Sequence, residues 1–377
     1  MRITFLMPGY MWTPSGGYRV IYEYANRLVD RGHHVTVVHP RRLKYLPAPN
    51  LPLRERLRRA KFGLIGLFST PVIDWQPIDK RVELLFVPNS GQRYLPDADV
   101  LFATAWQTVP SVLRASQAKG EKFYLIQGYE TWMGPKDLVD QTWLAPINKI
   151  VIARWLLELG NSMGASNLTH IPIAINHSRY RALRAIEDRP RQVVMALSWV
   201  EIKGSKDGIA ALEIAKRNFP DLSVVLFGNS RRPPWVPQWM SYSQDPEQER
   251  IINDFYNGSS IILSPSWTEG FSLPPAEAAA CGCAIVATDI KGHTEYVQEG
   301  VTGLLSPPRD PDALARNLCL LLERDDLRVR LAHSANDFIK QFTWDRSADL
   351  MEEFLFRSVP RKPLGQPSSS SIEVSPA

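Results

Sequence analysis

The stretch WTEGFSLPPAEAAACGCAIVATDI, residues 267–290, decides the fold of this chain. Two short apolar runs frame its loop and helix: residues 261–263 precede it and residues 284–287 lie near its end. Both runs have the composition of buried parallel strands, which are apolar throughout and bounded by turn residues. Between them we expect a loop containing Gly270 and a helix of small residues that Ser272 caps and that Gly282 ends. The stretch therefore predicts a strand, loop, helix and strand of a parallel α/β fold.

The N-terminus of that helix is a predicted anion site, because free N–H groups and a partial positive charge at the mouth of a sheet suit a phosphate. Two carboxylates, Glu269 on the loop and Glu277 in the helix, flank the site. Carboxylates accept hydrogen bonds from sugar and ribose hydroxyls. Each glutamate alone has a plainer interpretation, Glu277 as a complement to the helix dipole and Glu269 as a solvated loop residue. Together with the loop and the helix, the pair favours a binding site.

Glu269, seven intervening residues and Glu277, within EGFSLPPAEAAACGCAIVATD, resemble the donor-site motif of the family 4 glycosyltransferases. Those are retaining, metal-independent enzymes of the GT-B type, built from two facing Rossmann-like domains. The resemblance covers roughly residues 1–356 and is weaker in the first half. It implies an α/β fold with residues 1–175 as the acceptor domain, 176–342 as the nucleotide-sugar donor domain, 343–356 as a helix that crosses back to the first domain and 357–377 as a disordered Pro- and Ser-rich tail.

The resemblance also implies roles for individual residues. Glu277 would hold the ribose hydroxyls, and Glu269 would hold the transferred sugar. Lys203 would stabilise the leaving diphosphate together with the backbone at Gly16 and Gly17. Lys203 and Glu269 are the expected catalytic residues, with Glu269 as a covalent nucleophile kept as an alternative to front-face attack. The expected donor-binding set is Gly16, Gly17, Lys203, Glu269, Gly270, Phe271, Ser272, Leu273 and Glu277.

This chain departs from the family pattern at two places. Many members carry a histidine where Gln127 stands here, so Gln127 and Glu130 become the candidate contacts to the sugar or the acceptor; each has a plainer interpretation as a turn cap. Ser198 occupies the place of an arginine that binds the donor phosphates, which removes a forked cation from the site. The nearest candidate replacements in the sequence are Lys206, Arg231 and Arg232.

The beginning of the chain predicts a β-α-β unit. Residues 3–7 read as a strand, residues 18–31 as a helix with apolar positions at helical spacing, and residues 35–39 as a second strand. The loop between the first strand and the helix ends in Gly16-Gly17, at the sheet edge where open α/β folds bind ligands. The loop lacks the three spaced glycines of the dinucleotide motif, so NAD is not expected. The plainer interpretation of the glycine pair is a turn before a helix.

Composition excludes several other classes of protein. The net charge of +5 is modest, and we find no zinc-finger spacing or aromatic-basic signature, so no nucleic acid partner is expected. The three cysteines, Cys281, Cys283 and Cys319, do not make a disulfide framework. Cys281-x-Cys283 has the form of a metal half-site, but no second cluster supports it, so these two are interpreted as small buried thiols. Asp97-Ala98-Asp99 directly precedes a predicted strand and has no acidic cluster around it, so neither metal nor cofactor is expected. With no secretory signal and no spanning apolar stretch, a cytoplasmic location is predicted.

Residues 41–68 combine eight basic residues with an apolar run. Two interpretations stay open. The segment is either a solvated loop and helix over the first domain, or a peripheral contact with the inner face of a membrane or with an acidic lipid-linked acceptor.

The sequence as a whole predicts a hexosyl- or deoxyhexosyl-transferase that moves a sugar from a UDP-, GDP-, ADP- or dTDP-linked donor to a glycan or lipid-linked acceptor. Such an enzyme fits bacterial-type surface polysaccharide assembly. One alternative is a non-catalytic sugar- or nucleotide-binding relative, which the missing histidine and Ser198 favour. Another is a phosphorylase or epimerase of the same architecture, which would require a pyridoxal phosphate lysine or product formed without an acceptor.

Overall fold

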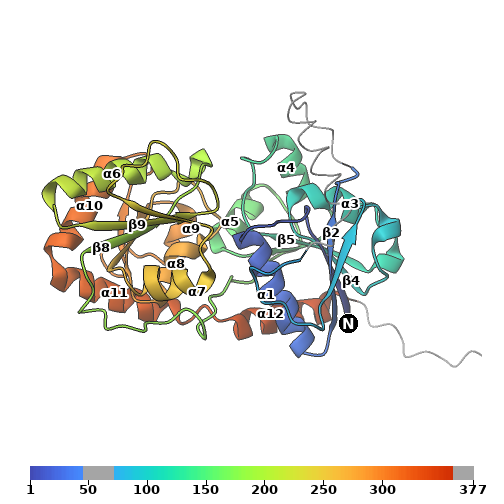
Figure 1. The fold of residues 1–377 in the computed structure, drawn as a ribbon. Coiled ribbons are helices and arrows are strands. Elements are labelled where there is room, and N and C mark those ends of the chain that lie inside the picture. Colours follow the sequence, from blue (N-terminus) through green and yellow to red (C-terminus); the bar gives the residue numbers. More distant parts are fainter. Residues whose placement is uncertain (46–71, 360–377) are drawn as a thin grey trace, which may run out of the picture.

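The structure is a computed structural model that describes residues 1–45 and 72–359. It contains two parallel β-sheets, each flanked by helices, that lie beside one another along the molecule (Figure 1). Most of the basic segment 41–68 and most of the tail 357–377 lie outside the described residues. The interpretations given for both segments therefore stay predictions. None of the helices in the described part of the chain combines the length and apolarity needed to cross a membrane.

The first sheet has seven strands in the order β3-β2-β1-β4-β5-β6-β7, all of them parallel. Its central strands are buried over nearly their whole length, which explains their continuous apolar sequences. The rings of Phe5, Phe102 and Phe123 stack across three neighbouring strands, with centroids 4.8 and 5.2 Å apart. The strands are β1 Arg2–Leu6, β2 His34–Pro40, β3 Glu83–Val87, β4 Val100–Ala103, β5 Glu121–Ile126, β6 Asn148–Val151 and β7 Leu168–His170.

The second sheet has six parallel strands in the order β10-β9-β8-β11-β12-β13. Strands β11 and β12 are the two apolar runs that frame the quoted stretch, and every residue in both is buried. The strands are β8 Gln192–Ala196, β9 Ser223–Gly228, β10 Ser241–Gln244, β11 Ile261–Ser264, β12 Ala284–Thr288 and β13 Leu304–Ser306.

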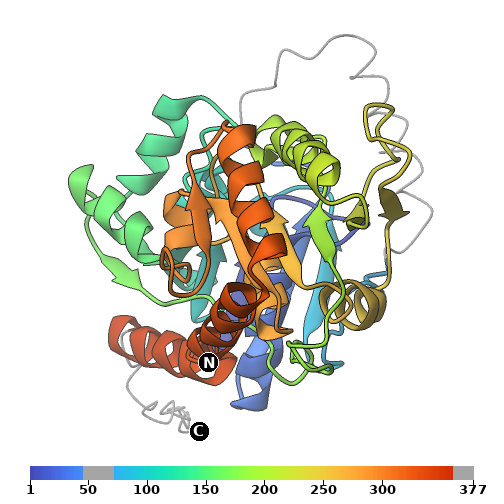
Figure 2. The same cartoon turned by 90° about the vertical axis from the view of Figure 1, so that its left-hand side faces the viewer.

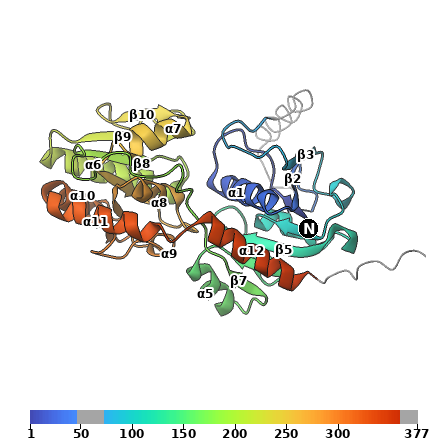
Figure 3. The same cartoon turned by 90° about the horizontal axis from the view of Figure 1, so that it is seen from below.

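Helices cover both sheets. In the second domain α6 and α10 lie side by side, as Figure 2 shows, and α8 packs with α11. In the first domain α1 lies along α12 (Figure 3). The helices are α1 Gly16–Asp30, α3 Val109–Leu113, α4 Lys136–Trp143, α5 Arg154–Ser162, α6 Ser205–Asn218, α7 Gln248–Arg250, α8 Leu273–Ala280, α9 Lys291–Thr294, α10 Pro311–Glu323, α11 Asp325–Ile339 and α12 Trp344–Ser358, with 3-10 turns at Gln92–Tyr94, Trp106–Thr108, Gln117–Lys119 and Glu201–Lys203 and a π-helix at Ile251–Tyr256.

The chain passes between the domains twice, at neighbouring points. Ile175 leaves the first domain and Thr343 returns to it, and the two form a short parallel bridge with a hydrogen bond from Ile175 N to Phe342 O (3.0 Å). Helix α12 then lies on the first domain, where Phe354 packs against the Phe123 ring of β5 with centroids 5.7 Å apart. The helix continues two residues beyond the expected boundary at 356.

Three local expectations are wrong. Ser272 does not cap α8 through its side chain; it has a left-handed backbone (φ +67°), and its carbonyl accepts a hydrogen bond from Tyr296 Oη (2.9 Å). The sequence also predicts one continuous helix over residues 246–258, whereas the structure has a single turn, α7, followed by a π-helix. Helix α1 begins at Gly16 rather than at Tyr18, so the glycine pair forms its first turn instead of a loop.

Candidate functional site

A cleft of about 1240 Å³ lies between the two domains. It is lined by residues at or just beyond the carboxyl ends of β1, β4, β5, β8, β9 and β11, which is where open parallel sheets bind their ligands. The residues expected to contact the donor, the sugar or the acceptor line this cleft, apart from the candidate replacement cations: Gly16, Gly17, Gln127, Glu130, Lys203, Glu269, Gly270, Phe271, Ser272, Leu273 and Glu277. The fold therefore brings together positions more than 250 residues apart in the sequence, while their roles stay predictions.

Lys203 and Glu269 form one ion pair on the second-domain side of the cleft. The Lys203 ammonium lies 2.7 Å from Glu269 Oε1 and 2.8 Å from Oε2, and Ser266 Oγ donates a further hydrogen bond to Oε1 (2.9 Å). The Glu269 side chain is 14% exposed and that of Lys203 is 38% exposed. The lysine is therefore the accessible cation of the pair, and an incoming phosphate can contact it.

The Lys203 turn is held against the loop after β11. Trp267 N donates to Ile202 O (2.7 Å), and the Trp267 indole donates to Asp207 Oδ2 (2.7 Å). Gly204 makes this approach possible: its φ is +59°, and a Cβ there would lie 2.0 Å from Pro265 O. Glycine at this position thus fixes where Lys203 meets Glu269.

His293 lies beneath the same loop and was not singled out from the sequence. It is fully buried; Nε2 is 2.9 Å from Ser264 Oγ and Nδ1 is 2.8 Å from Thr288 O. Burial lowers its pKa, so the ring stays neutral near pH 7. His293 therefore joins the ends of β11 and β12 below the loop that carries Glu269.

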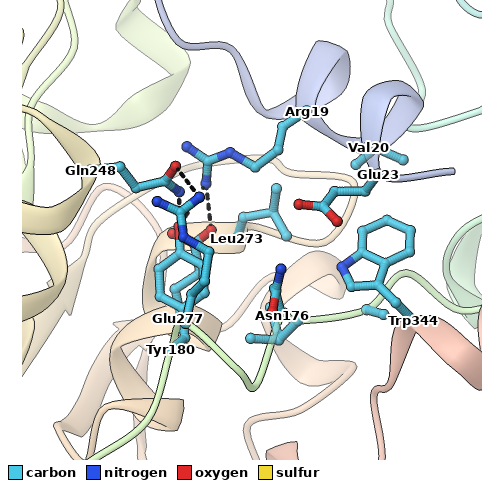
Figure 4. Close-up of a pocket in the computed structure, with 12 residues that line it drawn as sticks. Arg19, Val20, Glu23, Asn176, Tyr180, Gln248, Leu273, Glu277 and Trp344 are labelled. Atoms are coloured by element: carbon cyan, nitrogen blue, oxygen red, sulfur yellow. Dashed lines mark hydrogen bonds and ion pairs between the residues drawn. The ribbon is translucent and has the colours of Figure 1, made fainter. Parts of the chain in front are cut away.

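Glu277 does not stand free in α8. Arg19, from the first domain, donates to Glu277 Oε1 (2.6 Å) and to Tyr180 Oη (3.0 Å), and Figure 4 shows these side chains pointing toward one another. Sequence reasoning missed Arg19, although it lies only two residues after the glycine pair. Hydrophobic periodicity shows which face of a helix packs on its own domain. It does not show which polar residue of that helix will contact the other domain.

The cations expected to replace the missing arginine are elsewhere. Lys206 and Arg231 are exposed, and Arg232 donates to backbone carbonyls of its own loop, including Pro237 O (2.6 Å). None of the three lines the cleft. Among the described residues, the cations that do line it are Arg19 and Lys203. Ser198 lines the cleft as well, and its hydroxyl accepts a hydrogen bond from Val200 N (3.1 Å).

The first-domain wall of the cleft carries Gln127 and Glu130 beside apolar side chains. Gln127 Nε2 donates to Gly17 O (3.1 Å), which ties the end of β5 to the first turn of α1. Glu130 Oε2 accepts from Trp106 N (3.0 Å). Burial raises the pKa of Glu130 from near 4.5 to about 7. Trp132 and Met133 follow it and are exposed at the rim.

The raised pKa of Glu130 predicts a pH-dependent stability. A carboxyl that holds its proton more tightly when folded stabilises the fold fully below about pH 4.5, and this contribution is lost as the pH rises through about 7. Glu130→Gln keeps a neutral side chain at every pH. The melting temperature of the variant relative to wild type should therefore rise between about pH 5 and about pH 8. Glu121→Gln, at an exposed position in β5, the strand that precedes Glu130, is the control. Parallel curves for wild type and Glu130→Gln would contradict the expectation.

The two domains are joined across the cleft by contacts that sequence reasoning also missed. Trp155 N, in the first turn of α5, donates to Glu295 Oε1 (3.1 Å), and the Trp155 indole donates to Gly270 O (2.8 Å). On another side of the cleft Asn229 Nδ2 donates to Pro14 O (2.7 Å). The loop that carries Glu269 is thus held partly by the first domain.

The described residues contain no group of three or more His, Cys, Asp or Glu side chains placed to hold a metal ion. Asp99 pairs with Arg2 (2.9 Å) and Asp97 with Lys119 (2.8 Å), both outside the cleft. Cys281 and Cys283 are buried, and burial raises the pKa of both thiols, that of Cys283 to about 12. Both thiols are therefore protonated near pH 7.

Residues 191–324, which span β8 to α10, match the family model for glycosyl transferases group 1. The second domain is therefore similar to the glycosyl transferases group 1. Among similar proteins, the D-inositol 3-phosphate glycosyltransferase of Xylanimonas cellulosilytica is 33% identical over 151 residues, which cover 37% of this chain and 36% of that protein. The enzyme of the same name from Corynebacterium urealyticum is 36% identical over 118 residues, covering 31% and 28%. The chain thus matches about a third of the length of these relatives.

Solved glycosyltransferase structures match nearly the whole chain. Sucrose-phosphate synthase from Thermosynechococcus elongatus superposes with a TM-score of 0.70 at 16% identity, covering 94% of this chain and 98% of that one. HepE of Anabaena in complex with UDP-glucose gives 0.69 at 16% identity, with 95% and 100% covered. TarM of S. aureus, in complex with UDP among other ligands, gives 0.72 at 10% identity, with 94% and 99% covered. These likenesses confirm the expected two-domain GT-B glycosyltransferase fold.

Proposed function

We propose that the protein transfers a sugar from a nucleoside diphosphate donor to a hydroxyl group of a glycan or lipid-linked acceptor. The observation that carries the proposal is the convergence of the Lys203–Glu269 pair, the N-terminus of α8 and Glu277 on one cleft at the carboxyl ends of both sheets. The presence of UDP-glucose in the HepE complex and of UDP in the TarM complex supports a nucleotide in this cleft.

The donor would lie along the second domain. Glu277 would accept hydrogen bonds from the ribose hydroxyls. The diphosphate would lie between Lys203, the first turn of α1 at Gly16 and Gly17, and the start of α8. Pro274 and Pro275 have no N–H there, so the Leu273 N–H and the positive end of the helix dipole would favour the anion. Glu269 would hold the transferred sugar, with the backbone of Gly270–Leu273 around it. Because Lys203 already pairs with Glu269, the donor would contact both groups from the cleft side while they hold each other in position.

In the transfer step, the bond from the sugar's anomeric carbon to the phosphate oxygen breaks and a bond to the acceptor oxygen forms on the same face. The acceptor proton passes to the leaving phosphate oxygen, and the nucleoside diphosphate departs. Its developing negative charge would be stabilised by Lys203 and by the α8 N-terminus, so no metal ion is required in this scheme. Closure of the two domains would exclude water, which otherwise competes as the nucleophile.

The acceptor would lie on the first-domain wall, where Gln127 and Glu130 offer polar contacts and Trp132 an exposed ring. Such a wall suits a carbohydrate, because sugars present both hydroxyls and apolar ring faces. Assembly of a bacterial-type surface glycan fits this acceptor class. TarM, whose structure contains α-GlcNAc-glycerol, offers a parallel in fold. The proposal includes contact of the basic segment 41–68 with a membrane surface.

A non-catalytic relative that only binds a nucleotide or sugar is the second candidate, favoured by Ser198 in place of an arginine. The cleft nevertheless contains two cations, Lys203 and Arg19, which favours the transferase. Turnover in the purified protein that is lost in Lys203→Ala would exclude the binding-only relative.

Nucleotide binding is the direct test of the site. In chelator, one of UDP, GDP, ADP and dTDP should raise the melting temperature, because at about a hundredfold excess over Kd a ligand adds about 2.7 kcal/mol to the stability of the state that binds it. Glu277→Gln should reduce that shift. Glu249→Gln, an exposed glutamate in α7, should not. No shift with any of the four would refute the donor site.

A further inference from the structure

Arg19 and Glu277 form an ion pair that crosses from one domain to the other. Arg19 lies in the first turns of α1, and Glu277 lies in α8 on the second domain. Their side chains are 16% and 7% exposed, and a small cavity beside them opens between Glu23, Asn176 and Trp344 (Figure 4). The pair exists only while the two domains are in contact, because its partners belong to different domains.

The other titratable groups around Glu277 do not supply a charge. Tyr180, Tyr256 and Tyr296 face it, and burial raises the pKa of each hydroxyl. Burial likewise raises the pKa of the nearby Cys281 thiol. Arg179 lines the same small cavity but donates to Gln248 and Glu249. Among the described residues around Glu277, Arg19 is therefore the cation that compensates its buried charge.

The geometry leaves room for a ligand on Glu277 beside Arg19 and the Tyr180 hydroxyl, which also hydrogen-bonds this carboxylate. Arg19 Nη1 donates to Oε1, and a carboxylate has two oxygens with about four acceptor positions. Glu277 also lines the large cleft, on the side where the nucleotide is proposed to lie. Tyr180 Oη accepts a second bond from Arg19 Nη1 and one from Gln248 Nε2, so the guanidinium is fixed from two sides. A fixed guanidinium orients the carboxylate before any ligand arrives.

We propose that Arg19 is a positioning residue of the nucleotide site: it fixes the Glu277 carboxylate so that one oxygen remains for the ribose hydroxyls of a nucleoside diphosphate. The first domain thereby completes a site whose other contacts lie on the second domain. This inference rests on the proposed function, because it needs the ribose to lie at Glu277. It further means that ribose binding is strongest when the cleft is closed.

A double-mutant cycle tests whether the two residues act as a unit. The Kd of the diphosphate that binds most tightly among UDP, GDP, ADP and dTDP is measured by calorimetry in wild type, Arg19→Gln, Glu277→Gln and the double variant. Each single variant should weaken binding by about tenfold, because each removes the oriented, charged acceptor. The double variant should bind about as weakly as either single one. Arg19→Lys, which restores a cation, should bind more tightly than Arg19→Gln.

Arg27→Gln is the matched control. Arg27 lies on the same helix and pairs with Glu23 at the same 2.6 Å, with similar burial, but within the first domain and away from the large cleft. It should lower the melting temperature without changing the Kd. Equal Kd values for wild type and Arg19→Gln, or additive losses in the cycle, would overturn the inference and leave the proposed function intact. Wild-type protein that binds none of the four diphosphates would overturn both.

Discussion

Gly270→Ala is expected to slow the proposed sugar transfer at least a hundredfold while both domains stay folded. A Cβ at position 270 would lie 1.9 Å from Gln127 O and 2.9 Å from Gln127 C, which belong to the other domain. Backbone atoms cannot turn away as a flexible side chain can, so the methyl group must separate the domains at this point. A displacement of about 1 Å in a closed active site costs about a hundredfold in rate. The turnover number should fall by at least that factor.

The mechanism of this loss can be separated from simple instability. Gly300→Ala is the control, because it places a methyl group in open space at a residue with positive φ (+69°), where alanine is strained. Gly300→Ala should lower the melting temperature and leave the turnover number unchanged. Gly270→Ala should lower the turnover number and leave the melting temperature nearly unchanged. Small-angle scattering should show a more open molecule for Gly270→Ala alone. Normal turnover in that variant would mean that the contact between Gly270 and Gln127 is not part of the active arrangement.

Lys203→Ala is expected to reduce the turnover number by about 10² to 10³, the usual effect of removing one group that stabilises developing charge. The substitution removes a cation that lines the cleft and leaves the Glu269 carboxylate, 14% exposed, without its partner. Both changes disfavour a diphosphate leaving group. The measurement is steady-state release of nucleoside diphosphate under saturating donor, so that weaker binding does not mask the chemical step.

Lys206→Ala is the matched control for that experiment. It removes the same side chain three residues later, in the first turn of α6, where the lysine is exposed and does not line the cleft. Its turnover should equal that of wild type. An equal fall of the turnover number in Lys203→Ala and Lys206→Ala would mean that the overall positive charge around residues 203–206 matters, and not the specific pairing of Lys203 with Glu269.

The two-domain fold could be predicted because its signals are local. The apolar runs of β11 and β12, the helix of small residues between them and the glycine pair at residues 16 and 17 each occupy one short stretch of chain. Alternation of such units predicts parallel sheets with helices on their faces. The errors were also local in origin. Serine is a common helix cap, which is why Ser272 was expected to cap α8 with its side chain. Instead, its backbone is left-handed, and the hydrogen bond from Tyr296 to its carbonyl helps to hold that conformation.

Only part of the candidate site could be predicted from the sequence, because some of its residues act through contacts between the domains. Lys203, Glu269 and Glu277 belong to patterned segments, and all three line the cleft. Arg19, Trp155 and Glu295 carry no pattern that marks them out, because each acts through a partner in the other domain. Because serine stands at position 198 in place of an arginine, we expected a replacement cation nearby in the sequence. Among the described residues, the cation that lines the cleft besides Lys203 is instead Arg19 of α1.

The sequence alone determined the helices and strands and the motif in residues 267–290. The reason is that hydrophobic periodicity and turn chemistry act over a few neighbouring residues. Packing of the domains decided which charges meet. The Glu277 carboxylate, which the sequence presents as a free ligand group, is paired with a guanidinium 258 residues away in the chain. Coulombic attraction between buried groups depends on distance in space, and that distance is set only when the first and second domains come together.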